Sequence, residues 1–141
     1  MAKARTAYLK REHVPTRMAL QDAINNLRFK LALDDSYIPF ECKGYIPCTL
    51  DGEDAGIDIK FGTTDVNALT PQNKVTVGDR DIAMTIRSGA DPREIVSATI
   101  ISATLANSFD AKIQKQGEDT FENADQLLKT ARSEFQELSE F

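Results

Sequence analysis

The pattern of apolar and polar residues is most distinctive in residues 91–109. Asp91 can cap a helix N-terminus and Pro92 suits the first helical position, so both favour a helix that begins here. From Ile95 to Phe109 the sequence has no charged residue, and apolar or small side chains occupy more than one face. A surface helix would have one apolar and one charged face. The pattern therefore predicts a central helix that neighbouring elements cover on most sides.

Two further segments have helical periodicity. Thr16 is a candidate N-cap, and apolar residues recur at helical spacing behind it, which predicts a helix over residues 16–30. Residues 27–33 also alternate like a strand, so the end of this helix is open, and we place it before the polar cluster that begins at Asp34. Residues 121–138 combine an apolar stripe with an acidic face, which predicts a final amphipathic helix.

A β-rich region lies between the first two helices. Residues 44–50 have the composition of a strand, and residues 57–61 alternate apolar and charged side chains. We expect the two to form a hairpin joined by a polar turn, residues 51–56. Pro47 restricts the first strand to a sheet edge or a bulge. Residues 65–79 are expected to be a polar connection.

Two more strands are expected around the central helix, residues 81–88 before it and residues 111–116 after it. If they are parallel, this strand–helix–strand unit is expected to be right-handed. The predicted fold is a single α+β domain over residues 16–141. It consists of a mainly antiparallel sheet of about four strands packed against three helices, in the order α-β-β-β-α-β-α.

Length, composition and charge limit the class of protein. The chain has 141 residues, 41% of them hydrophobic and 28% charged, which is typical of one globular domain with a real core. Residues 1–15 are polar and basic and end at Pro15, so we expect a loosely held arm. The net charge is −5, and an acidic body disfavours a nucleic-acid partner because it repels phosphates.

The sequence also indicates the compartment. The first 20 residues lack the apolar run of a secretory signal, and no stretch predicts a membrane span, so we expect a cytoplasmic protein that does not bind a membrane. Cys42 and Cys48 are then expected to be free thiols. His13, the only histidine, is expected to be solvated in the polar arm.

Signatures of catalysis and of metal binding are missing from the sequence. The carboxylates of residues 51–58 do not fit a calcium loop, because the glycines fall at other positions and the distal glutamate is missing. No phosphate-binding glycine pattern occurs, and no Cys and His set has the spacing of a zinc site. We therefore expect no catalytic residue, no metal and no cofactor.

Arg87 is a candidate for binding a small anion. It lies on the exposed face of a predicted strand, shortly before the N-terminus of the central helix, and a helix N-terminus favours negative charge. Asp91 and Glu94 already occupy that end of the helix, so any anion site there would be weak.

Acidic side chains form the main candidate site. The hairpin turn and the last helix could present carboxylates to a basic protein partner, because complementary charge steers association. Ordinary solubility is the alternative interpretation of such charged faces. The candidate contact residues are Asp51, Glu53, Asp54, Asp58, Glu122 and Asp125.

One resemblance to a known family is carried by the run Gly44-Tyr45-Ile46-Pro47-Cys48, followed by Gly52 and Gly56-Ile57-Asp58. It resembles a strand–turn–strand signature of bacterial immunity proteins, which are encoded beside secreted toxins of polymorphic, type VI or contact-dependent systems. Residues 81–106 are similar to the second half of that family, and the resemblance covers about residues 16–110. It implies a non-enzymatic cytoplasmic protein that binds and neutralises a cognate toxin.

Two other functions stay open on the sequence. The chain could be a structural or adaptor subunit, such as a chaperone-like component of a secretion system, that forms a homodimer or larger oligomer through Ile100 and Leu105 of the central helix. It could also be a small ligand-binding domain that uses Arg87, Cys48 and the acidic residues. The mass in solution would separate the first alternative from a one-to-one inhibitor.

Overall fold

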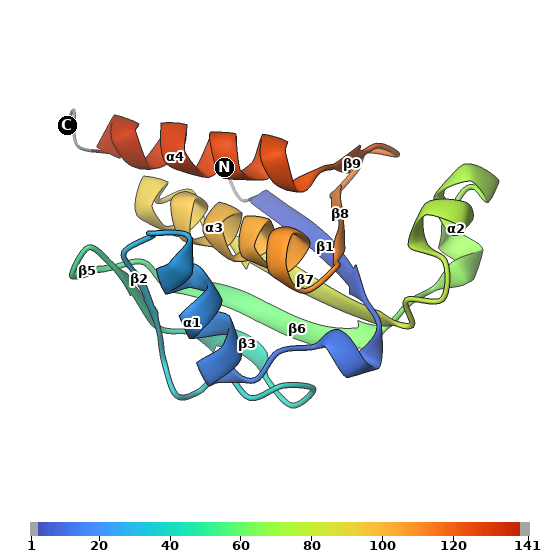
Figure 1. Cartoon of the computed structure of the whole chain (residues 1–141), viewed down its shortest axis with the longest axis horizontal. Coiled ribbons are helices and arrows are strands. Elements are labelled where there is room, and N and C mark those ends of the chain that lie inside the picture. Colours follow the sequence, from blue (N-terminus) through green and yellow to red (C-terminus); the bar gives the residue numbers. More distant parts are fainter. Residues whose placement is uncertain (1–2, 139–141) are drawn as a thin grey trace.

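Two antiparallel sheets form the framework of the protein (Figure 1). The computed structural model describes residues 3–138. The large sheet consists of β1 (Lys3–Leu9), β3 (Lys43–Ile46), β6 (Ile57–Thr63), β7 (Ile82–Ser88), β8 (Lys112–Lys115) and β9 (Phe121–Glu122), in the order β3-β6-β7-β1-β8-β9. The small sheet consists of β2 (Leu31–Leu33), β4 (Cys48–Leu50) and β5 (Glu53–Asp54), in the order β2-β4-β5.

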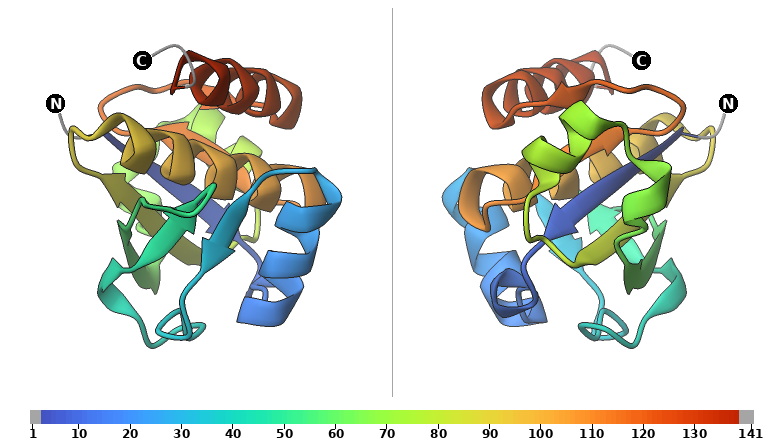
Figure 2. Two further views of the ribbon diagram at one scale, coloured as in Figure 1. Left: turned by 90° about the vertical axis from the view of Figure 1, so that its left-hand side faces the viewer. Right: turned by 90° about the vertical axis from the view of Figure 1, so that its right-hand side faces the viewer.

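The helices of the described residues are α1 (Arg17–Asn26), α2 (Pro71–Val77), α3 (Pro92–Ser108) and α4 (Ala124–Leu138), with short 3-10 turns at Arg11–His13 and Val66–Ala68. Figures 1 and 2 show α3 between the large sheet and α4, with α1 beside it. We call the sheet face that packs against α3 the inner face. The opposite, outer face is partly covered by α2, whose Val77 packs with Tyr8.

Residues 1–15, which the sequence predicts to be a loose arm, contain the strand β1. Ladders to β7 and β8 hold this strand on both sides, so the prediction is wrong. The sequence pattern did not predict this strand because Arg5, a charged residue, occupies a buried position on the inner face, the same face as Ala7. The usual alternation of apolar and polar residues is therefore missing. His13, expected to be solvated, is likewise half-buried.

The predicted architecture is also wrong. Residues 3–138 form four α-helices and nine strands in two antiparallel sheets, of six and three strands, instead of one sheet of about four strands with three helices. The expected order α-β-β-β-α-β-α is therefore not observed, although the chain is α+β. Most of the difference comes from β1 and from short strands that a single-sequence pattern cannot resolve.

Pro47 accounts for the second sheet. The segment predicted as one strand, residues 44–50, divides at this proline into β3 and β4, which join different sheets. Proline has no backbone N–H to donate to a ladder, so the strand cannot continue through it. The predicted hairpin becomes two ladders: β3 pairs with β6, and β4 pairs with β5.

The central helix is confirmed. In α3 every side chain from Val96 to Leu105 is buried, and the Asp91 carboxylate accepts a hydrogen bond from the N–H of Arg93 at 2.8 Å, as expected of a cap. The buried hydroxyls of Ser102 and Thr104 donate to backbone carbonyls one turn earlier, at 2.9 and 2.8 Å. The helix therefore buries polar residues without leaving their hydroxyls unpaired.

The strands on either side of α3 are present, but they are not neighbours. Both β7 and β8 run antiparallel to β1 and lie on its two sides, so they are parallel to each other with β1 between them. The crossover through α3 therefore spans β1. This arrangement places the N-terminal strand directly beneath the central helix (Figure 1).

Several element boundaries also differ from the prediction. Helix α1 has Thr16 as its N-cap but ends at Asn26, because Arg28 takes a positive φ of 67° and the chain then forms β2. The expected polar connection, residues 65–79, contains α2. The final helix begins at Ala124 because the preceding residues form the edge strand β9.

Candidate functional site

The acidic turn predicted as a candidate site lies in the hairpin between β4 and β5. Asp51 and Gly52 are the two central residues of this hairpin, with φ angles of 53° and 83°, a geometry for which Asp-Gly is a favoured pair. Asp51, Glu53 and Asp54 are exposed. Lys30 lies 3.8 Å from the Asp51 carboxylate, and both side chains are well exposed, so this ion pair is weak.

Tyr45 is the most exposed aromatic side chain among the large apolar residues of the described chain, with 59% of its surface accessible. It lies on β3, where its register partner on β6 is Asp58. Its ring rests against Gly56, where any side chain would collide with the phenol group. The absence of a side chain at Gly56 therefore leaves the space that the Tyr45 ring occupies.

Three carboxylates lie near enough to Tyr45 to affect the pKa of its phenol group. Partial burial raises the pKa of Tyr45, and the negative charges of Glu94, Asp54 and Asp58 raise it further because they would repel a phenolate. We call Tyr45, Asp54, Asp58 and Glu94 the Tyr45 patch. It combines an apolar ring, a hydroxyl donor and negative charge, which is a combination that recognises cationic side chains.

The sequence predicted only part of this patch. Asp54 and Asp58 were candidate contact residues, whereas Tyr45 and Glu94 were not. Glu94 was assigned to the start of the central helix, and its carboxylate does accept a hydrogen bond from the N–H of Gly89 at 3.1 Å. The available signal for Tyr45 was its place in a strand beside Pro47, which favours an edge and hence exposure.

Arg87 lies on the outer face of β7, directly opposite Asp58 on β6, and is exposed. Its nearest helix N-terminus, that of α3, already carries the Asp91 cap and Glu94, as the sequence predicts. The negative charges around Arg87 would repel a small anion. An anion site at Arg87 stays a prediction without further support.

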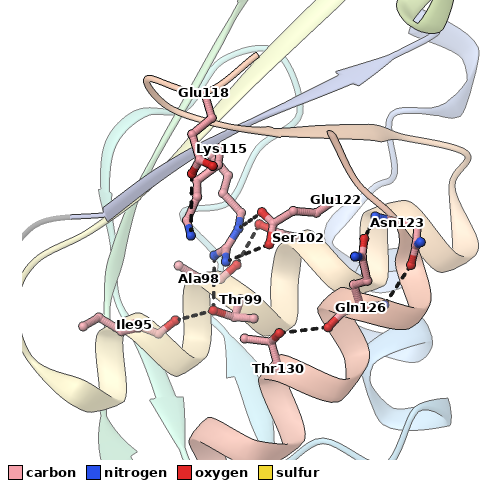
Figure 3. Close-up of polar contacts among 11 residues, drawn as sticks. Ile95, Ala98, Thr99, Ser102, Lys115, Glu118, Glu122, Asn123, Gln126 and Thr130 are labelled. Carbon is pink, nitrogen blue, oxygen red and sulfur yellow. Dashed lines mark hydrogen bonds and ion pairs between the residues drawn. The ribbon is translucent and has the colours of Figure 1, made fainter. Parts of the chain in front are cut away.

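Glu122 and Asp125 are on elements at the other end of the large sheet from β3 and Tyr45. Glu122 is on β9, at the edge of the large sheet opposite β3, and Asp125 is exposed in the first turn of α4. Figure 3 shows the Glu122 carboxylate turned inward toward Thr99. It accepts a hydrogen bond from the Nε of Arg5 at 2.8 Å, and the Arg5 Nη1 donates to the Thr99 hydroxyl at 3.2 Å. Glu122 therefore holds the fold together, which argues against its predicted role in partner contact.

The two thiols and the histidine do not line one pocket in the described residues. No cluster of three or more His, Cys, Asp or Glu side chains in residues 3–138 is arranged to hold a metal ion. Burial raises the pKa of Cys48 to about 12 and also raises that of Cys42, so both thiols stay protonated near neutral pH. His13 lines a cavity of about 410 Å³ together with Glu12 and Asp110, and neither thiol is part of its lining.

Comparison with known proteins identified no matching family model, no similar curated protein and no similar solved structure. Within residues 3–138, none of the helices has the length and apolar character needed to cross a membrane.

Proposed function

We propose that this chain is a non-enzymatic binding protein of the immunity type, which binds and neutralises a basic bacterial toxin in the cytoplasm. The observation that carries the proposal is the Tyr45 patch, in which an aromatic side chain is 59% exposed and bordered by three carboxylates. Tyrosine is enriched among the residues that dominate binding energy at protein interfaces. Surrounding negative charge adds steering toward a positively charged partner.

The proposed mechanism is occlusion. A partner's Lys or Arg side chain would lie over the Tyr45 ring while its charge meets Asp54 and Asp58. Glu53 and Asp51, on the adjoining hairpin, would extend the same negative field. Binding of this kind blocks a toxin's active surface without any chemistry of its own, which agrees with the dispersed placement of the thiols and the histidine.

The test is to co-purify the tagged chain with the products of genes adjacent to its own, and to measure the partner's toxic activity with and without the chain. The proposal predicts a one-to-one complex with a basic protein whose activity the complex suppresses. Recovery of the chain without any such partner would contradict it. A partner whose activity is unchanged in the complex would also contradict neutralisation.

One alternative loses its proposed surface. Ile100 and Leu105 of α3 are 0% exposed in the single chain, so an adaptor cannot oligomerise through them without unfolding. The ligand-binding alternative required Cys48 and Arg87 to act together. Cys48 is buried in the small sheet, whereas Arg87 is exposed on the outer face of the large sheet, so this pair does not form one site.

A further inference from the structure

The strand β3 is an open edge of the large sheet. It pairs with β6 on one side, and its residues make no other backbone–backbone hydrogen bond with the described chain. Gly44 lies in the middle of this strand, and a Cβ built on it would meet nothing within 4 Å. Gly44 therefore places no side chain on the inner face at the point where a second sheet edge would meet β3.

Two lysines stand side by side at one end of this edge. Lys43 and Lys60 are register partners on β3 and β6, both are exposed on the outer face, and neither forms an ion pair with the described residues. Like charges directly opposite each other on neighbouring strands are destabilising. Asp58, two residues along β6 on the same face, is a carboxylate close to this pair, but it forms no ion pair with either lysine in the described residues.

The next row of outer-face side chains has the opposite character. Two residues further along β3, Tyr45 is the register partner of Asp58, with Glu94 and Asp54 nearby. The edge therefore presents positive charge at one end and an aromatic ring with negative charge at the other. This pattern is complementary to itself when it is reversed in direction.

We propose that β3 pairs antiparallel with β3 of a second copy of this chain, around a two-fold axis at Gly44, so that two large sheets become continuous. Directly opposite residues of two antiparallel strands lie on the same face of the sheet. With Gly44 opposite Gly44, Lys43 of each copy therefore lies beside Tyr45 of the other. Asp58 is the next side chain in the same row, within reach of the lysine, so Lys43, which faces Lys60 within its own chain, gains a carboxylate from the second copy.

The length of β3 limits the strength of this contact. The strand has four residues, and Pro47 follows it without an N–H to extend the ladder. A small interface of this kind gives a weak, concentration-dependent dimer. The inference stands whether or not the chain binds a toxin, but a dimer would cover the edge that carries Tyr45, so a protein partner and the second copy would compete.

Sedimentation velocity of the full chain, from roughly 10 µM to 1 mM, tests the proposal in the range of weak interfaces. We expect wild type to shift from monomer toward dimer as its concentration rises. Lys43→Glu places a negative charge opposite Lys60, so the monomer gains stability. The same glutamate faces Asp58 of the second copy, so the self-association constant falls about tenfold or more. Asp58→Lys loses self-association in the same way. Lys112→Glu, a charge-matched control on β8, associates like wild type.

The decisive sample is an equal mixture of the Lys43→Glu and Asp58→Lys variants. Around a two-fold axis the introduced glutamate of one copy meets the introduced lysine of the other, and the second contact keeps its natural lysine and aspartate. The mixture should therefore form heterodimers with wild-type affinity, although each variant alone stays monomeric. Circular dichroism confirms that each variant is folded.

Three results would overturn the proposal. Wild type could stay monomeric over the whole range, the two variants could associate as wild type does, or their mixture could stay monomeric. A monomer whose β3 amides become protected from hydrogen exchange on adding an oligo-lysine peptide would assign the edge to a basic partner segment instead of a second copy.

Discussion

Arg5 is buried beneath the central helix, where it forms an ion pair with Glu122. Substitution of either residue tests how much this ion pair contributes to the stability of the fold. The Arg5 side chain is 8% exposed and that of Glu122 is 24% exposed, with Nε 2.8 Å from the carboxylate. The pair joins β1 to β9, two strands separated by β8 in the sheet. Removing the carboxylate leaves a buried guanidinium with Thr99 as its other partner, whereas removing the arginine leaves a carboxylate that water can reach. The two single substitutions should therefore differ in cost.

The magnitudes follow from this difference in burial. Breaking a fully buried ion pair costs about 3–5 kcal/mol, and partial access of water to Glu122 lowers this to about 2–3 kcal/mol for Glu122→Ala. Arg5→Met fills the space with an apolar chain and should cost about 1 kcal/mol. At about 3 °C for each kcal/mol in a chain of this size, Glu122→Ala lowers the Tm by about 6–9 °C.

Urea unfolding of wild type, both single variants and the double variant Arg5→Met/Glu122→Ala measures these free energies and their coupling. We expect the double variant to be closer to wild type than Glu122→Ala is, because no charge is left unpaired. A Glu122→Ala variant within about 0.5 kcal/mol of wild type would refute the reasoning. So would an Arg5→Met variant that costs more than Glu122→Ala.

Three further predictions concern the core, a buried thiol and the Tyr45 ring. Leu105→Ala in α3 removes a fully buried side chain and should lower the free energy of unfolding in urea by about 2–5 kcal/mol. The control Val75→Ala, at an exposed position on α2, should change it by less than about 0.5 kcal/mol. Equal losses in the two variants would contradict the central place of α3. Because burial raises the pKa of Cys48 from 9.0 to about 12, the unfolded chain loses this proton first, and stability should fall as the pH rises from 9 toward 12. Cys48→Ala should flatten that part of the profile, and an unchanged slope would show that this thiol does not contribute. Gly56→Ala pushes the exposed Tyr45 ring aside, so it should weaken partner binding several-fold with little change in Tm, and undiminished binding would argue against the ring position as a contact.

The elements that the sequence predicts well are those whose patterns are local. The central helix has a cap, a proline at its first position and a long uncharged run, and the structure confirms it as α3. The strand over residues 81–88 shows strict alternation, and β7 buries Ile82, Met84 and Ile86 as that alternation requires. In both segments the local sequence indicates the burial that is observed, on all sides of α3 and on one face of β7.

The elements that the sequence misses depend on distant contacts. A charged residue on β1 disguises the strand, because the partner that satisfies Arg5 is Glu122, 117 positions away. The division at Pro47 is visible as a break, but nothing local says that the two halves enter different sheets. Helix α2 had a readable start, since Thr70 caps it and Pro71 follows, yet its exposed Val75 obscures any apolar stripe.

The candidate site was predicted in part for the same reason. The carboxylates of residues 51–58 are adjacent in sequence, so their clustering could be foreseen. The proximity of Glu94 to Tyr45 could not be foreseen from the sequence. It depends on the pairing of β6 with β7, which brings the start of α3 close to the sheet edge formed by β3. The pairing of Glu122 with Arg5 could not be foreseen either, because an acidic residue before an amphipathic helix is normally exposed, whereas here a buried arginine holds it.

The central claim, that the Tyr45 patch binds a basic protein partner, is tested most directly by calorimetric titration of the purified partner with Tyr45→Ala. Removal of a dominant interface side chain costs about 2 kcal/mol or more, which is about a 30-fold loss of affinity. We predict this loss for Tyr45→Ala and unchanged affinity for Asp22→Asn, which removes one exposed carboxylate from α1. Wild-type affinity of the Tyr45→Ala variant would contradict the claim.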